Sequence, residues 1–302
     1  MLVILYFIFL FATSVSICGP EKFRLPQLYF SRSRSYFNCM GIFLGMMLLG
    51  WGDVLKPNQG IPLSIGFYSS GCISGAETLP LDGSGFQVMR PSRNRFYGQS
   101  STLSFIENLG KTLSAINSGI LVGDISQPRG GPMVSGHASH QIGLDVDVWF
   151  WSHPEQNNRS LSIEERETLP LITMLGTNGL VDPKKFTQEQ ITKLKIASNS
   201  PGVERIFVNP AIKTYLCAIT PDAESAWLHN LRPWAGHNEH FHVRLSCPKD
   251  SKLCVTQDPP PPGNGCNEVY PKISDLEALE ENNPLTFPSE CGAVLNDPSI
   301  KN

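Results

Sequence analysis

The sequence of 302 residues has few charged side chains and almost no excess of either sign. Charged residues make up 17% of the chain and the formal net charge is −3, so we predict no nucleic-acid partner. No apolar run reaches the roughly 20 residues that a helix needs to span a bilayer. Internal repeats and heptads are also missing. With 41% hydrophobic residues, the composition is that of a globular protein.

The first 55 residues differ from the rest of the chain. Leu2–Ile17 is almost wholly apolar, and a second apolar run, Gly41–Trp51, follows Arg32 and Arg34. A short apolar run after positive charge is typical of a secretory signal. We therefore interpret residues 1–55 as a signal or targeting segment and predict an exported protein. An uncleaved membrane anchor is the alternative.

The cysteines form no CxxC pair, which argues against a cysteine-ligated zinc site or a redox motif. Cys18 and Cys39 fall in the targeting segment. An even number remains, which in an exported chain suggests disulfides: Cys72, Cys217, Cys247, Cys254, Cys266 and Cys291. Six cysteines allow about fifteen pairings. Cys247 and Cys254 flank a short polar loop, and we predict that they form a local bridge.

Helix and strand patterns mix without regular β-α alternation, which favours an α+β fold with an antiparallel sheet. Capping-box spacing predicts three helix starts, at Ser104/Glu107, Ser162/Glu165 and Thr187/Gln190. No internal linker interrupts the region between residues 60 and 255. We therefore predict a single domain over residues 56–302 that ends in a Pro-rich tail.

Two short stretches hold five of the seven histidines, Gly136–Trp149 and Gly236–Arg244. We predict that the two stretches meet and bind one zinc ion, Zn²⁺. The candidate ligands are His137, His140, Asp145, Asp147, His237, His240 and His242. Catalytic zinc sites combine three protein ligands with one open position. A histidine left beside that position can transfer a proton near neutral pH.

The alternation of side chains along a strand narrows the set of possible metal ligands but does not settle it. Asp145 and Asp147 are two residues apart in a strand-like run, so they share one face, as do His240 and His242. Within each pair, alternation alone leaves open which residue binds the metal.

The order of these residues resembles a known family. The run SGHASHQIGLDVD at residues 135–147, with HFH at 240–242, is similar to the HxxxxxxD…HxH signature of the LAS group of zinc metallopeptidases. Within that group the chain most resembles the penicillin-insensitive murein endopeptidases. Further matching stretches are GCI at 71–73, QVMR at 87–90, RIFVNPAIK at 205–213, RPW at 232–234, HVRL at 242–245 and CP at 247–248.

The resemblance implies roles for six residues. It makes zinc ligands of His140, Asp147 and His242, places His240 beside the zinc-bound water, and makes His137 and His237 further active-site histidines. Histidines like His137 can bind a second zinc in the family, with downstream partners. The corresponding region here, residues 176–182, has no histidine, so we predict one zinc per chain.

The resemblance also implies an activity and a fold. The fold is a small antiparallel β-sheet flanked by helices, with the zinc site on the sheet. The activity is hydrolysis of D-alanyl–meso-diaminopimelyl cross-bridges in peptidoglycan, in the periplasm and insensitive to β-lactams. The alternatives are a zinc D,D-carboxypeptidase and a non-catalytic, zinc-stabilised binding module. Anchoring to the inner membrane and a homodimer stay open.

Overall fold

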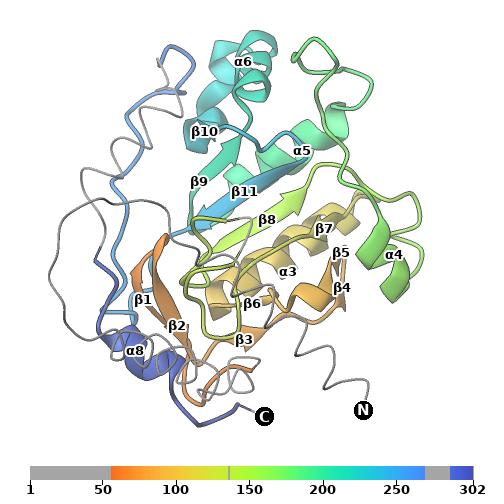
Figure 1. The fold of residues 1–302 in the computed structure, drawn as a ribbon. Coiled ribbons are helices and arrows are strands. Elements are labelled where there is room, and N and C mark those ends of the chain that lie inside the picture. The colour runs from red at the N-terminus through yellow and green to blue at the C-terminus, as the bar shows by residue number, and fades with distance from the viewer. Residues whose placement is uncertain (1–55, 135–136, 269–285, 302) are drawn as a thin grey trace, which may run out of the picture. The chain divides into compact units, whose positions relative to one another are not determined.

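A computed structural model describes residues 56–134, 137–268 and 286–301 (Figure 1). The expected targeting segment, residues 1–55, lies outside this described part. No helix in the described ranges combines the length and apolarity needed to cross a membrane.

The described residues form an α+β fold built on a seven-stranded sheet with the order β10-β9-β11-β8-β7-β5-β4. Its strands are β4 (Asp82–Gly83), β5 (Phe86–Val88), β7 (Ile120–Val122), β8 (Asp145–Trp149), β9 (Val203–Val208), β10 (Leu231–Pro233) and β11 (His240–Leu245). Two small sheets accompany it, pairing β1 (Leu63–Phe67) with β2 (Ser70–Ser74) and β3 (Glu77–Thr78) with β6 (Tyr97–Gly98). The prediction of an α+β fold is therefore confirmed.

The helices lie between and after these strands. They are the α-helices α3 (Ser100–Ser114), α4 (Ile163–Thr168), α5 (Gln188–Ser198), α6 (Pro210–Ile219) and α8 (Glu290–Leu295), and the 3₁₀ helices η2 (Pro91–Arg93) and η3 (Asp222–Asn230).

The expectation of an antiparallel sheet is correct at the centre and for the edge pair β4–β5, but the sheet as a whole is mixed. β11 pairs antiparallel with β8 and β9, and β8 pairs antiparallel with β7. In contrast, β5–β7 and β9–β10 are parallel pairs. Parallel neighbours need a crossover connection that returns the chain to the end where the first strand began. α3 lies in the connection between β5 and β7, and α6 with η3 lies in the connection between β9 and β10.

Two of the three predicted helix starts are confirmed as complete capping boxes. Ser162 caps α4 with Glu165, and Thr187 caps α5 with Gln190. The start at Ser104 is wrong, because α3 begins at Ser100 after Gln99. The backbone carbonyl of Gln99 already accepts hydrogen bonds from the first turn, so the helix begins without a side-chain cap.

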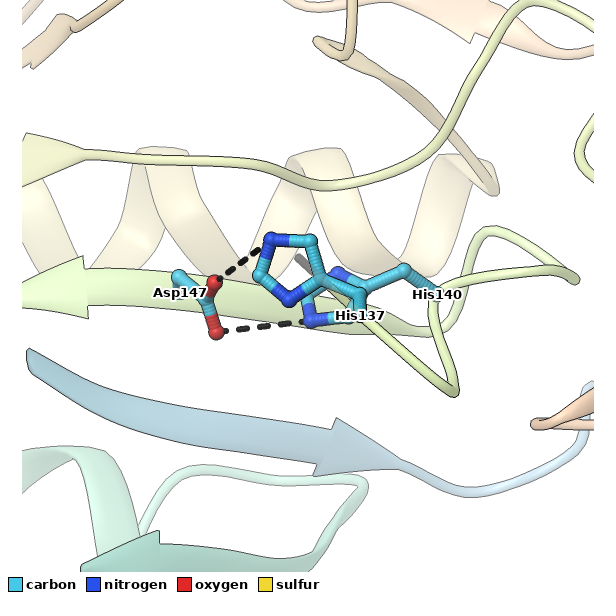
Figure 2. Close-up of side chains that lie close together, drawn as sticks. All are labelled: His137, His140 and Asp147. Atoms are coloured by element: carbon cyan, nitrogen blue, oxygen red, sulfur yellow. Dashed lines mark ion pairs between the residues drawn. The ribbon is translucent and has the colours of Figure 1, made fainter. Parts of the chain in front are cut away.

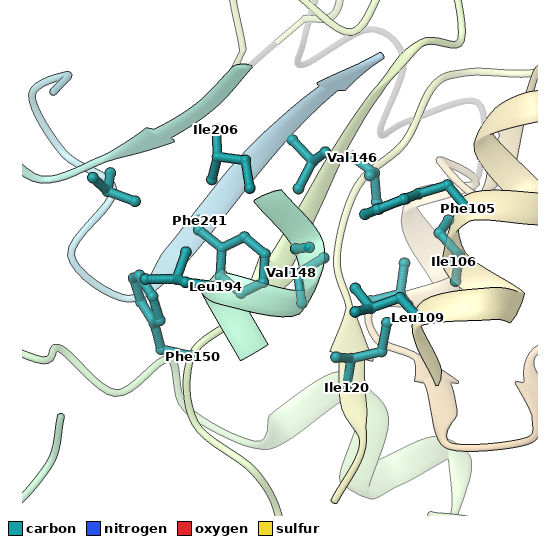
Figure 3. Packing of buried hydrophobic residues seen from close by; sticks show 14 of the residues in the cluster. Phe105, Ile106, Leu109, Ile120, Val146, Val148, Phe150, Leu194, Ile206 and Phe241 are labelled. Atoms are coloured by element: carbon teal, nitrogen blue, oxygen red, sulfur yellow. The ribbon is translucent and has the colours of Figure 1, made fainter. Parts of the chain in front are cut away.

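The core covers one face of the sheet (Figure 3). Val146, Val148 and Phe241 point from β8 and β11 towards α3 and α5, where they meet residues such as Leu109 and Leu194. Burying each such side chain contributes about 1.5–3 kcal/mol. Since alternate strand residues face opposite ways, the polar residues of β8 and β11 are placed on the other face.

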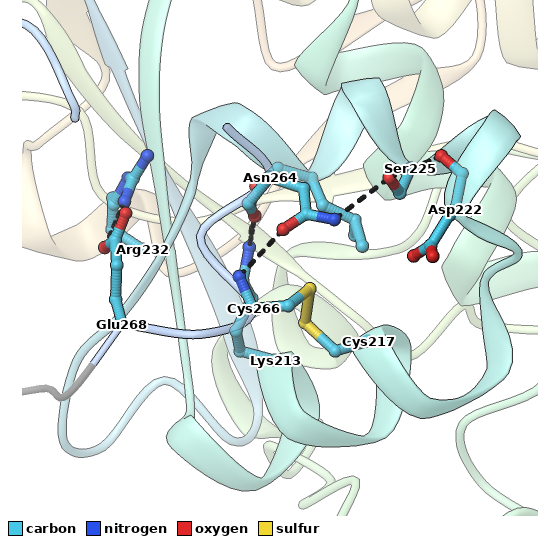
Figure 4. The surroundings of a disulfide bond; sticks show 9 residues. Lys213, Cys217, Asp222, Ser225, Arg232, Asn264, Cys266 and Glu268 are labelled. Carbon is cyan, nitrogen blue, oxygen red and sulfur yellow. Dashed lines mark hydrogen bonds and ion pairs between the residues drawn. A yellow bond between two sulfur atoms is a disulfide. The ribbon is translucent and has the colours of Figure 1, made fainter. Parts of the chain in front are cut away.

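Three disulfides join the described cysteines. The predicted local bridge, Cys247–Cys254, is confirmed. Cys72–Cys291 ties β2 to α8. Cys217–Cys266 ties α6 to the segment after residue 258, where Lys213 donates to the Asn264 carbonyl (Figure 4).

Candidate metal centre

The centre of the site is set by the register of two neighbouring strands. His242 of β11 lies opposite Asp147 of β8, and Arg244 lies opposite Asp145. His240 lies opposite Trp149, at the end of the paired region. The two stretches that sequence analysis singled out therefore meet side by side, with their polar residues on the face away from the core.

Three atoms converge beside β8. His140 Nε2 and His242 Nδ1 lie 3.1 Å apart, and they lie 3.4 and 3.2 Å from Asp147 Oδ1. Ligand atoms about 2.0–2.1 Å from a tetrahedral zinc are roughly 3.3 Å from one another. The spacing of this group therefore fits three ligands of one zinc ion.

The partners behind the two rings support the same fit. His140 Nδ1 lies 2.7 Å from the Ile125 carbonyl, which only accepts, so Nδ1 carries the proton and Nε2 keeps its lone pair. His242 Nε2 lies 3.1 Å from Asp145 Oδ1 without hydrogen-bond geometry, and His242 Nδ1 faces Asp147 Oδ1. A carbonyl or carboxylate behind each imidazole is the usual outer partner of a metal-bound histidine.

Asp147 completes the group with a buried oxygen. Within the described part of the chain, Oδ1 of Asp147 receives no hydrogen bond. Burial would raise the pKa of Asp147, but the neighbouring imidazoles of His240 and His140 hold it well below its usual range, so the carboxylate is ionised. Three lone-pair atoms facing one point repel one another unless a cation lies between them. Two imidazoles and a carboxylate are a donor set that suits zinc.

His240 and His237 line a cavity of about 420 Å³ beside this group. His240 Nε2 lies 3.6 Å from Asp147 Oδ1, and its side chain is 22% exposed. Burial lowers the pKa of His240, so the ring is neutral near pH 7 and can accept a proton. Burial and the neighbouring His242 lower the pKa of His237 to about 4.

Two of the site histidines have a left-handed backbone conformation, which residues other than glycine rarely adopt. The φ angles of His140 and His237 are 69° and 48°. Such conformations persist where the surroundings fix them, and they cluster at functional sites. The backbone N–H of His140 donates to Asp145 Oδ2, and the backbone N–H of Asn209 donates to the His237 carbonyl.

His137 approaches the same carboxylate from the loop before β8 (Figure 2). Its Nε2 lies 3.6 Å from Asp147 Oδ2, and candidate ligand atoms of His137, His140 and Asp147 all lie within 4.8 Å of one another. The same Nε2 lies closer, at 2.9 Å, to Oδ2 of Asp124. The structure thus brings together all six residues that sequence analysis assigned to the site.

Two residues that contribute to the site, Arg244 and Asp124, were not predicted from the sequence. Arg244 is buried against Asp145, with Nε 2.9 Å from Oδ1, and its guanidinium lies 4.1 Å from the centre of the Tyr68 ring. Asp124 lies two residues after β7, just before the Gly- and Pro-rich loop. A short apolar run followed by a single acid and then by the loop to the histidines was the available signal.

The comparisons with known proteins fit this site. The family model described as penicillin-insensitive murein endopeptidase matches residues 64–296. A relative of that name from Haemophilus influenzae is 40% identical over 260 residues, covering 83% of this chain and 90% of its own length. Relatives of the same name from Pectobacterium atrosepticum and Yersinia enterocolitica are 41% and 42% identical, over 82% of this chain and 88% and 90% of their own lengths.

Proposed function

The chain belongs to the penicillin-insensitive murein endopeptidase family, and we propose that it is a zinc-dependent D,D-endopeptidase. Its substrate would be the D-alanyl–meso-diaminopimelyl cross-bridge of peptidoglycan. The observation that carries the proposal is the convergence of His140 Nε2, His242 Nδ1 and Asp147 Oδ1 beside a cavity lined by further histidines. These three residues would hold the zinc ion.

A zinc ion bound there would polarise the scissile carbonyl and lower the pKa of a bound water to about 7. His240 is the base in this proposal, because its neutral ring lies next to the ligand group and lines the cavity. After taking a proton from the attacking water, the imidazolium returns it to the departing diaminopimelyl amine.

His237 has a different role in the proposal. Its Nδ1 lies 2.9 Å from the Ala235 carbonyl and carries the proton in that contact. That bond and its packing 5.1 Å from the His240 ring orient the imidazole at the cavity wall. We assign His237 to orienting the substrate next to the carbonyl that reacts.

Insensitivity to β-lactams follows from the proposed chemistry. These inhibitors acylate a nucleophilic serine, whereas the attacking group here is water. The substrate lies outside the cytoplasm, so we also propose that residues 1–55 direct the protein to the periplasm.

Digestion of purified cross-linked sacculi tests the proposal. We expect muropeptide dimers to fall to monomers, the reaction to stop with a chelator, and β-lactams to leave it unchanged. Conversion of pentapeptides to tetrapeptides without loss of dimers would instead indicate a D,D-carboxypeptidase. Absence of both reactions would refute the enzymatic assignment.

Two substitutions separate the metal ligand from the base. His242→Ala should abolish both zinc binding and cleavage, whereas His240→Ala should keep the zinc and lower turnover about 100-fold or more. His153→Ala is the matched control, since His153 lines a different cavity. Undiminished cleavage by His240→Ala would exclude that histidine as the base.

A further inference from the structure

Arg244 and Gln257 line the cavity beside the ligand group and contact each other. Arg244 is buried and donates to both carboxylate oxygens of Asp145, from Nε to Oδ1 over 2.9 Å and from Nη2 to Oδ2 over 3.3 Å. Its Nη1 donates over 2.8 Å to Oε1 of Gln257. Because the fully buried Asp145 offsets much of the charge of Arg244, the pair offers directed hydrogen-bond donors more than net charge.

The contact with Arg244 fixes which end of the Gln257 amide is left for a ligand. A guanidinium group only donates hydrogen bonds, so the amide oxygen of Gln257 must face Nη1. The amide nitrogen is then turned away from the arginine. Within the described part of the chain this nitrogen donates to no partner. Gln257 therefore has N–H donors to offer to a molecule in the cavity.

The backbone that carries Gln257 is held on both sides. The Cys247–Cys254 disulfide closes the loop before it, and the Val255 N–H donates over 2.9 Å to the Gly66 carbonyl of β1. On the other side, Arg205 donates to the carbonyl of the residue that follows Gln257. These contacts fix the amide at the cavity before any substrate arrives.

The composition of the cavity suits a negatively charged group. Among the described residues that line it, none is acidic, whereas the donors include Arg244, Gln257 and the hydroxyl groups of Ser69 and Ser139. Hydrogen bonds from such donors to an ionised acceptor are stronger than those to a neutral one.

The substrate of the proposed reaction carries a negative charge next to the bond that breaks. The departing amine of diaminopimelate is attached to a carbon that also bears a free carboxylate, so this carboxylate lies close to the reacting carbonyl. Arg244 is two residues from His242 in β11, on the same face and about 7 Å along the strand. The carboxylate can therefore reach Arg244 and Gln257 while the carbonyl lies at the ligand group.

We propose that Gln257, oriented by Arg244, is a specificity-determining residue that donates to this free carboxylate. The inference rests on the proposed function for the identity of the substrate. It also gives the Cys247–Cys254 bridge a part in the site, because the bridge anchors the segment that carries Gln257. A terminal D-alanine bears a carboxylate in the same position, so the contact would serve the carboxypeptidase alternative as well.

The test compares two cross-linked muropeptide dimers that differ only at this carboxylate, which is free in one and converted to the carboxamide in the other. The full-length wild type should cleave the acid with a kcat/KM about 10–100-fold higher, the usual effect of a hydrogen bond to a charged group. Equal kcat/KM values for the two dimers would overturn the inference.

Gln257→Glu replaces the donor with a carboxylate and keeps an oxygen for Arg244 to bind. Since like charges then face each other, kcat/KM for the acid should fall by about tenfold or more, and the carboxamide should become the better substrate. Gln188→Glu is the matched control and should keep the wild-type preference, since Gln188 lines a different cavity. An equal loss on both dimers in a folded Gln257→Glu protein would contradict the contact.

A failure of the proposed function would be visible separately. If the wild type cleaves neither dimer, that function fails, and calorimetric binding of the same two dimers to the full-length protein decides the role of Gln257. Tighter binding of the acid by the wild type and of the carboxamide by Gln257→Glu supports the contact. Equal affinities for the two dimers would exclude it.

Discussion

Removal of the long-range disulfide should destabilise this protein about twice as much as removal of the local one. Cys72 and Cys291 are 219 residues apart in sequence, and Cys247 and Cys254 are 7 apart. Chain-entropy arguments give about 5.4 kcal/mol at 25 °C for a loop of about 220 residues and about 2.5 kcal/mol for one of about 8. Replacing both cysteines of each pair with alanine should therefore give costs that differ by about 3 kcal/mol.

Contacts in the folded state increase the difference in stability cost between the two alanine-pair variants. Cys72 and Cys291 are fully buried and pack with Ile65 and Val294, so alanine there also loses apolar contacts. Arg129 continues to hold the C-terminal segment, donating to the carbonyls of residues 294, 295, 297 and 299. We expect the variant to fold, with most of its loss arising from a more expanded unfolded chain.

Equilibrium unfolding in urea of the oxidised wild type and both alanine pairs provides the measurement. The Cys72/Cys291 pair variant should show the larger loss of unfolding free energy and a larger m-value, because its unfolded chain exposes more surface. An equal or greater cost for the Cys247/Cys254 pair would contradict a stabilisation that grows with loop length. A large loss of unfolding free energy in the Cys72/Cys291 variant without a change in m-value would also contradict it.

Three further predictions concern the metal, a buried arginine and a buried lysine. A chelator should lower Tm and zinc should restore it, because a ligand at 100 times its Kd adds about 2.7 kcal/mol to the stability of the folded state. A Tm that responds to neither would contradict a metal site. Arg166→Met should lower the free energy of unfolding in urea by about 3 kcal/mol or more without changing zinc affinity. The reason is that the buried Arg166 donates to the carbonyls of residues 81, 88 and 161. A cost below about 1 kcal/mol would contradict this prediction. Burial, aided by the charge of Arg232, lowers the pKa of Lys213 from 10.5 to about 8. The unfolded chain then binds the proton more tightly, so wild-type stability should rise between pH 8 and 10.5 relative to Lys213→Met, and parallel pH profiles would contradict it.

Local patterns in the sequence predicted local structure well. The family assignment, the α+β class and the Cys247–Cys254 bridge are confirmed, as are the helix starts at Ser162 and Thr187. Each of these confirmed predictions depends on residues close in sequence or on motifs that occur in a fixed order along the chain. The start at Ser104 failed because a backbone carbonyl of Gln99 can begin a helix without a side-chain cap.

Features that depend on distant pairing could not be predicted from the residues alone. Alternation placed Asp145 with Asp147 on one face, but the register that sets His242 opposite Asp147 joins strands 95 positions apart. Asp124 was missed for the same reason. Its partners, Arg95 and His137, come from two other segments, and nothing in a linear pattern shows that one carboxylate faces both.

The position of the core relative to the site bears on what metal removal should do. Small zinc-stabilised modules fold only around their metal, so a chelator unfolds them. Here Val146, Val148 and Phe241 pack on the opposite face of the strands that carry Asp147 and His242, in a core that includes α3 and α5. That core and the disulfides hold the strands in register without help from the ion. The chelated protein should therefore lose activity and some Tm while keeping its far-ultraviolet circular dichroism at 25 °C. Unfolding by the chelator at that temperature would favour the binding module over the enzyme.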